Sequence, residues 1–129
     1  TAANDAPSAT NLTQTIGYSE GDATVALDDI VVSDADSNET ITAELTLAEP
    51  SYGALTTTGT ASYTAGTGVW TITDTVANVN AALANVAFVP GSDTDQNTTI
   101  TTHIEDTATT GPADGSIALN VTAANDAPS

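Results

Sequence analysis

The chain has 129 residues, of which 17 are Asp or Glu and none is Lys or Arg, so its formal net charge is −17 at pH 7. Because binding to nucleic acid depends on basic side chains that neutralise phosphates, this charge excludes a nucleic-acid interface, and it disfavours anionic lipid for the same reason. The length suits one domain, and a compact chain this acidic needs salt or bound cations against self-repulsion.

Two absences narrow the class of protein further. The chain has no cysteine, so it has neither disulfides nor a thiolate metal site. No apolar run reaches the roughly 18 residues of a membrane span, and no signal peptide is recognisable. We therefore expect no membrane insertion, and we expect any export signal to lie elsewhere in a parent protein.

The first half of the chain predicts strands. Residues 12–18 form an opening strand that ends in turn residues at 19–22. Apolar residues alternate over 25–32, but their phase shifts at Asp28 and Asp29, which predicts a second strand with a bulge. The clearest strand is 41–47, where Ile, Ala and Leu alternate with Thr and Glu as in a half-buried antiparallel strand.

The second half adds one helix to further strands. Glycines separate short segments near 55, 62–65 and 69–73, as hairpin turns do. Asp74 is the predicted N-cap of a short helix near residues 75–84, with an apolar stripe formed by Val76, Val79 and Leu83. Strands follow at 86–89, 100–105 and 117–121, with the apolar side chains of the last two facing inward.

About seven antiparallel strands with one short helix predict an all-β, Greek-key β-sandwich. Trp70 is the only tryptophan. It is interpreted as a core residue, although with Tyr63 and Tyr52 it is also compatible with an exposed platform for sugars. His103, the only histidine, is predicted on the exposed face of its strand without a functional role.

Two loops share the pattern D-x-D-x-N, at 34–38 and at 93–97. Alternate oxygen-bearing side chains in a tight loop converge on one point, which suits calcium with its six to eight oxygen ligands. Neither loop is an EF-hand, because Glu39 and Thr98 stand where that loop needs Gly at its sixth position. Any calcium is therefore held by several loops together. The alternative for either loop is a solvated turn.

The segment TAANDAPS occurs twice, at 1–8 and at 122–129. Such an identity indicates one period of a tandem array. We expect an inter-repeat linker at 1–8, a sandwich repeat at 9–121 and the start of the next linker at 122–129.

Strand directions predict where the acidic residues gather. We call the end of the sandwich at which residues 1–8 enter the near end, and the end from which residues 122–129 leave the far end. Counting strands predicts these candidate calcium ligands at the near end: Asn4, Asp5, Asp34, Asp36 and Asp106. The corresponding candidates at the far end are Glu20, Asn125 and Asp126, with Asp22, Asp93 and Asp95 as weaker assignments.

The motifs that carry a family resemblance are NDAP at 4–7 and 125–128, VVSDADS at 31–37, VANVNAALANVAFVP at 76–90 and IED at 104–106. In this order and spacing, over essentially the whole chain, they resemble a cadherin-like, immunoglobulin-type repeat of long calcium-dependent bacterial surface adhesins of the RTX type. The resemblance implies calcium ions shared between the near-end ligands of one repeat and a Glu, matched here by Glu20, of the preceding repeat. The animal cadherin motif D-R-E is absent, so the number of ions per junction stays open.

The resemblance also implies a function. We expect a structural extender repeat, rigidified by calcium at its junctions with neighbouring identical or near-identical repeats and monomeric when isolated. It implies an extracellular location on the bacterial surface after type I secretion. The alternative is a module that binds carbohydrate or protein. We expect no enzyme, because no nucleophile stands with an activating base.

Overall fold

The computed structural model describes residues 6–19, 23–27, 29–34, 40–91 and 96–122. This part of the chain forms eleven strands, one α-helix and one short 3-10 helix, η1. Their bounds are β1 Ser8–Ala9, β2 Gln14–Ser19, β3 Val25–Ala26, β4 Val32–Ser33, β5 Thr40–Leu47, η1 Pro50–Tyr52, β6 Gly53–Leu55, β7 Ser62–Thr64, β8 Val69–Thr75, α1 Val76–Asn85, β9 Ala87–Pro90, β10 Thr98–Asp106 and β11 Gly115–Thr122.

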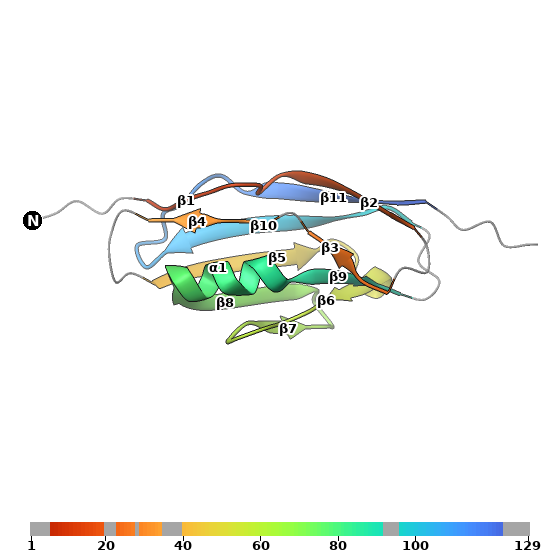
Figure 1. The fold of residues 1–129 in the computed structure, drawn as a ribbon, viewed down its shortest axis with the longest axis horizontal. Coiled ribbons are helices and arrows are strands. Elements are labelled where there is room, and N and C mark those ends of the chain that lie inside the picture. Colours follow the sequence, from red (N-terminus) through yellow and green to blue (C-terminus); the bar gives the residue numbers. More distant parts are fainter. Residues whose placement is uncertain (1–5, 20–22, 28, 35–39, 92–95, 123–129) are drawn as a thin grey trace, which may run out of the picture.

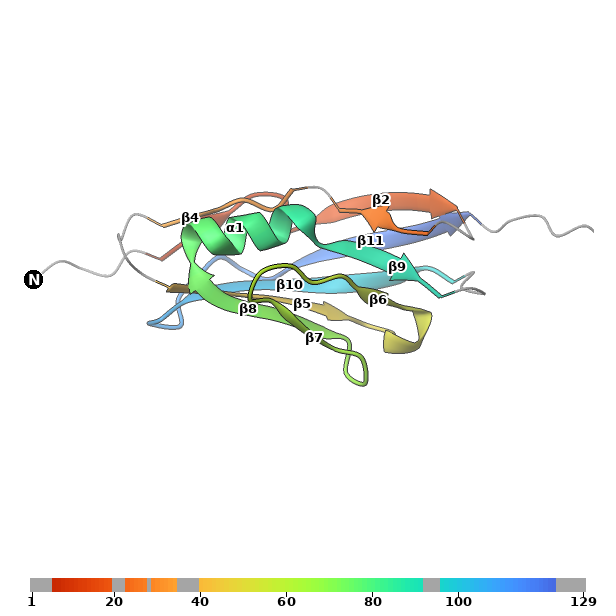
Figure 2. The ribbon, with the colours of Figure 1, turned by 60° about the horizontal axis from the view of Figure 1, so that its bottom comes forward.

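The largest sheet has six strands in the order β2-β11-β10-β5-β8-β7. All neighbours are antiparallel except β2 and β11, which run parallel. Helix α1 lies across one face of this sheet, against β5 and β8, and β9 continues the same layer (Figures 1 and 2). Smaller sheets β3-β9-β6 and β1-β4 complete an all-β sandwich.

The core lies between these layers. In the long strands, buried and more exposed side chains alternate as the sequence predicts. In β5 every second side chain is buried, from Ile41 to Leu47, and β10 alternates in the same way. Helix α1 buries Val79 and Leu83 of its predicted stripe, with Ala82 beside them. The periodicities of two and 3.6 residues therefore identify the inward faces correctly.

Trp70 is fully buried, and its indole N–H donates to the Thr56 carbonyl at 3.0 Å. The interpretation as a core residue is confirmed, because a buried indole ring cannot form an exposed platform for sugars.

Three local expectations are wrong. The fold has more strands than the seven expected. The predicted second strand is two separate strands: β3 pairs with β9, whereas β4 pairs with β1. The phase shift before Ile30 therefore marks a crossing between sheets instead of a bulge. The helix cap is Thr75, the last residue of β8, whose hydroxyl accepts from the Asn78 N–H at 3.2 Å. Asp74 lies one residue too early for that role, and its carboxylate accepts from the Asn78 side-chain amide instead.

The strands run along the long axis of the molecule, so strand ends form its two ends (Figure 1). β1 begins at the near end and β11 finishes at the far end, on opposite sides of the picture. No helix in the described ranges is long and apolar enough to cross a membrane.

Candidate functional site

At the near end, the chain that follows the first NDAP motif lies against the strand that leads to Asp34. Ser8 pairs with Ser33 in the β1-β4 ladder, so Pro7 and Asp34 are the next residues outward on the two strands. Pro7 is buried and Asp34 is half-buried. The last residues of the first TAANDAPS segment, Pro7 and Ser8, therefore lie beside Ser33 and Asp34.

Asp106 ends β10 at the same end, where it pairs with Ile41 of β5. Only 3% of Asp106 is exposed. Its carboxylate accepts from the N–H groups of Ala108 and Thr110, at 3.0 and 2.9 Å, and from the Thr110 hydroxyl at 2.9 Å. A carboxylate offers about four lone-pair positions and can therefore accept several hydrogen bonds at once. Through these three bonds Asp106 holds the turn after β10 in a fixed position.

At the far end the parallel strands β2 and β11 finish together, and their last paired residues are Ser19 and Thr122. Glu20 follows the first of these strands in sequence, and the second TAANDAPS begins at Thr122. The two copies of the motif therefore belong to opposite ends of the sandwich.

Of the predicted ligands, Asp34 and Asp106 are described and share one end. The others lie outside the described residues: Asn4, Asp5, Glu20, Asp22, Asp36, Asp93, Asp95, Asn125 and Asp126. Within the described ranges no group of three or more His, Asp or Glu side chains has an arrangement that could hold a metal ion.

A network beside α1 was not predicted from the sequence. The Asp74 carboxylate accepts from the Thr60 hydroxyl at 2.7 Å, the Asn78 side-chain amide at 3.0 Å and the Thr75 N–H at 2.8 Å. These bonds, the one from Asn78 first, lower the pKa of Asp74. Asp74 therefore supports the helix start from outside the cap position.

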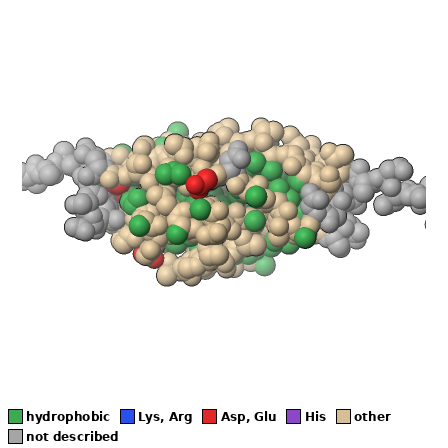
Figure 3. All heavy atoms as spheres, in the orientation of Figure 1, with side chains coloured by type: hydrophobic (Ala, Val, Ile, Leu, Met, Phe, Trp, Pro, Cys, Tyr) green, Lys and Arg blue, Asp and Glu red, His purple; other side chains and the backbone are tan. Residues whose placement is uncertain are grey.

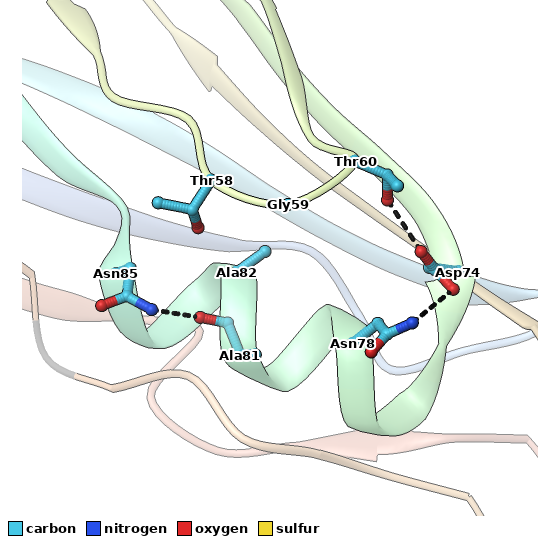
Figure 4. A pocket seen from close by; sticks show the side chains of 8 residues that line it. All are labelled: Thr58, Gly59, Thr60, Asp74, Asn78, Ala81, Ala82 and Asn85. Carbon is cyan, nitrogen blue, oxygen red and sulfur yellow. Dashed lines mark hydrogen bonds between the residues drawn. The ribbon is translucent and has the colours of Figure 1, made fainter.

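The same network borders an open groove of about 360 Å³ between α1 and the loop before β7 (Figure 4). Ala81 and Ala82 line it, and Asn78 and Asn85 lie at opposite ends of the lining helix segment. The groove lining thus combines two small apolar side chains with amide, hydroxyl and carboxylate groups.

His103 lies on the predicted face of β10, but it is held between two carboxylates. Its Nδ1 is 2.6 Å from Asp114, and its Nε2 is 2.7 Å from Glu105. Glu44 is its cross-strand neighbour on β5. Hydrogen bonds to Asp114 and then Glu105 raise the pKa of His103, because they favour the imidazolium, while partial burial opposes the shift.

The long face in Figure 3 carries few carboxylates among its described side chains, and its apolar side chains are scattered. Val31, 40% exposed, is the one large hydrophobic side chain exposed in the described part of the chain. This surface offers no broad apolar patch for a partner.

No family model matches the chain, and no curated protein matches it either.

Proposed function

We propose that the chain is a structural extender repeat of a long cell-surface adhesin, joined to neighbouring repeats through NDAP linkers that calcium stiffens. The observation that carries the proposal is the arrangement of the ends. The first TAANDAPS segment leads into a strand paired beside Asp34, at the end where Asp106 is fixed, and the second copy starts at the opposite end. Tandem copies therefore bring the far end of one repeat to the near end of the next.

Charge supports calcium as the ion at such a junction. The chain has a net charge of −17 and no basic side chain other than one histidine. Facing carboxylates repel in a short linker, and a hard cation that takes six to eight oxygens turns them into ligands. Millimolar extracellular calcium matches the weak affinities of extracellular modules, in accord with export to the cell surface.

Small-angle scattering of two joined repeats tests the proposal. With millimolar calcium the maximum dimension should approach the end-to-end length of two rigid sandwiches, and chelator should shorten it, since the linker then bends. The double variant Asp34→Ala, Asp36→Ala should resemble the chelated protein even in calcium. Asp29→Ala removes an exposed carboxylate between β3 and β4 and serves as the matched control. An unchanged maximum dimension in wild type contradicts the rigid rod.

The groove beside α1 favours a second candidate function, a module that binds carbohydrate. Its volume of about 360 Å³ and its polar edges suit a ligand rich in hydroxyl groups. A glycan array probed with one repeat tests this function, and binding that Asn78→Ala abolishes would support it. A repeat that binds no glycan contradicts it.

A further inference from the structure

Strand β4 has a β-strand neighbour along one edge only, among the described residues. On that edge β1 pairs with it, and the Thr10 N–H donates to the Val31 carbonyl at 3.0 Å. The other edge, on which the peptide groups of Val32 lie, faces helix α1. A strand of two residues with one neighbour frays easily unless its second edge is also satisfied.

The side chain of Asn80 satisfies that second edge. The Val32 N–H donates to Asn80 Oδ1 at 2.7 Å, and Asn80 Nδ2 donates to the Val32 carbonyl at 3.0 Å. One amide side chain thus replaces the peptide group of a neighbouring strand. We call this pair of bonds the Asn80 clasp. The side-chain amide carries a donor and an acceptor side by side in one plane, as the clasp requires.

Helix α1, which carries Asn80, is anchored by its buried side chains and by its N-terminal cap. Val79 is fully buried, Leu83 is 2% exposed, and the Thr75 hydroxyl caps the first turn. Val32 itself is 1% exposed. The clasp therefore connects the short strand to the packed core, and Asp34 follows only two residues after Val32.

We propose that Asn80 is the positioning residue of the near-end calcium site, because the clasp fixes the strand that delivers Asp34 to the end where Asp106 is held. This inference rests on the proposed function. It also gives the helix a role: α1 takes the place of the strand that would otherwise pair with β4. Because coupling is reciprocal, calcium bound at Asp34 should in turn stabilise the clasp.

The test uses two joined repeats with Asn80→Leu in both copies. The substitution removes the donor and acceptor, keeps a similar size and suits a helix. In the calcium-free protein the Val32 amide should exchange its hydrogen at least about tenfold faster, and the dissociation constant for calcium should rise about tenfold, as is typical when a group that orients a metal ligand is lost. Asn85→Leu, at an exposed position of the same helix where the side-chain amide donates to the Ala81 carbonyl, should change neither quantity.

The outcomes separate the two proposals. A purely structural role would lower the calcium-free melting temperature and leave the dissociation constant unchanged, and that result overturns the positioning role while calcium binding stands. If wild type binds no calcium, both proposals fail. Should Asn80→Leu not fold, the wild type still decides: saturating calcium should slow exchange of the Val32 amide, with Thr71 of the central sheet as the reference. Unchanged Val32 exchange overturns the inference.

Discussion

At the residue scale, two buried threonines on the inward face of β10 differ in their hydrogen-bond partners. Thr102 is fully buried, and its hydroxyl donates to the Leu12 carbonyl at 2.8 Å while accepting from the Gly115 N–H at 3.1 Å. The Leu12 carbonyl packs so closely on Gly115 that no Cβ fits there. Thr98 is 7% exposed, and its hydroxyl has no hydrogen-bond partner in the described part of the chain.

We therefore predict opposite effects for the same substitution. Thr102→Val should lower the free energy of unfolding by about 1–3 kcal/mol, because it leaves a carbonyl and an N–H unpaired at a strand junction. Thr98→Val should raise it by up to about 1 kcal/mol, because it removes a buried hydroxyl without a partner. Chemical denaturation of both variants measures the difference. Equal losses would mean that the Thr102 bonds contribute nothing specific.

At the element scale, the connection between β10 and β11 is fastened at both of its ends. Asp106 holds the turn after β10, and Asp114, the last residue before β11, pairs with His103. Both ring nitrogens of His103 lie beside carboxylates, so the imidazolium can donate to Asp114 and Glu105 together. The one basic side chain of the protein thus fastens this connection to the sheet.

This arrangement predicts a pH dependence with a definite sign. The folded-state pKa of His103 is raised above its ordinary value of 6.5. The contribution of His103 to stability is therefore fully present below the unfolded pKa and is lost as pH rises through the folded one. The stability difference between wild type and His103→Gln, by denaturation from about pH 5.5 to 8.5, should be greatest at the acid end and at most about 1 kcal/mol for such an exposed pair.

Asp114→Asn gives a matched control, because it keeps the shape and removes the charge of one of the two carboxylates that contact His103. An NMR titration of that variant should return the His103 pKa part of the way towards 6.5, with Glu105 and the neighbouring Glu44 still present. A stability difference between wild type and His103→Gln that grows with rising pH would contradict a raised His103 pKa in the folded protein.

The sequence predicts those elements whose pattern is local. The alternation in β5 and β10 and the stripe through Val79 and Leu83 identify their inward faces, because each periodicity is set by the element itself. Strand directions then suffice to bring Asp34 and Asp106 to one end. The division of 25–33 between two sheets depends on which distant strand each residue meets, β9 or β1, and no local pattern records that choice.

The Asn80 clasp and the His103 pair were missed for a related reason. Asn80 is separated from Val32 by 48 positions in sequence, and His103 from Asp114 by 11. An Asn in a helix is equally compatible with solvent. A His that shares one face of its strand with Thr101 and Glu105 gives no hint of a carboxylate in the next connection. Only the packing of α1 on the sandwich and the course of the 107–114 connection bring these groups together.

At the scale of the whole molecule, the strands run lengthwise and the two copies of TAANDAPS belong to opposite ends (Figure 1). Under the proposed function, a complete calcium site needs the far end of one repeat and the near end of the next. An isolated repeat offers each half alone. A half site holds fewer oxygens and leaves more of the ion hydrated, so it should bind calcium more weakly.

We therefore predict that two joined repeats contain one class of calcium site, at the junction, that a single repeat lacks. Isothermal titration calorimetry of both proteins should show that site with an affinity at least about tenfold above the others, a difference of about 1.4 kcal/mol. Calcium bound at the junction should also raise the melting temperature of the two joined repeats. Sodium chloride at matched ionic strength should not produce this rise, because sodium screens the charge of −17 without binding at the junction as calcium does. Equal affinity per repeat in the two proteins would show that each repeat binds calcium by itself, and the junction would then have no part in stiffening the array.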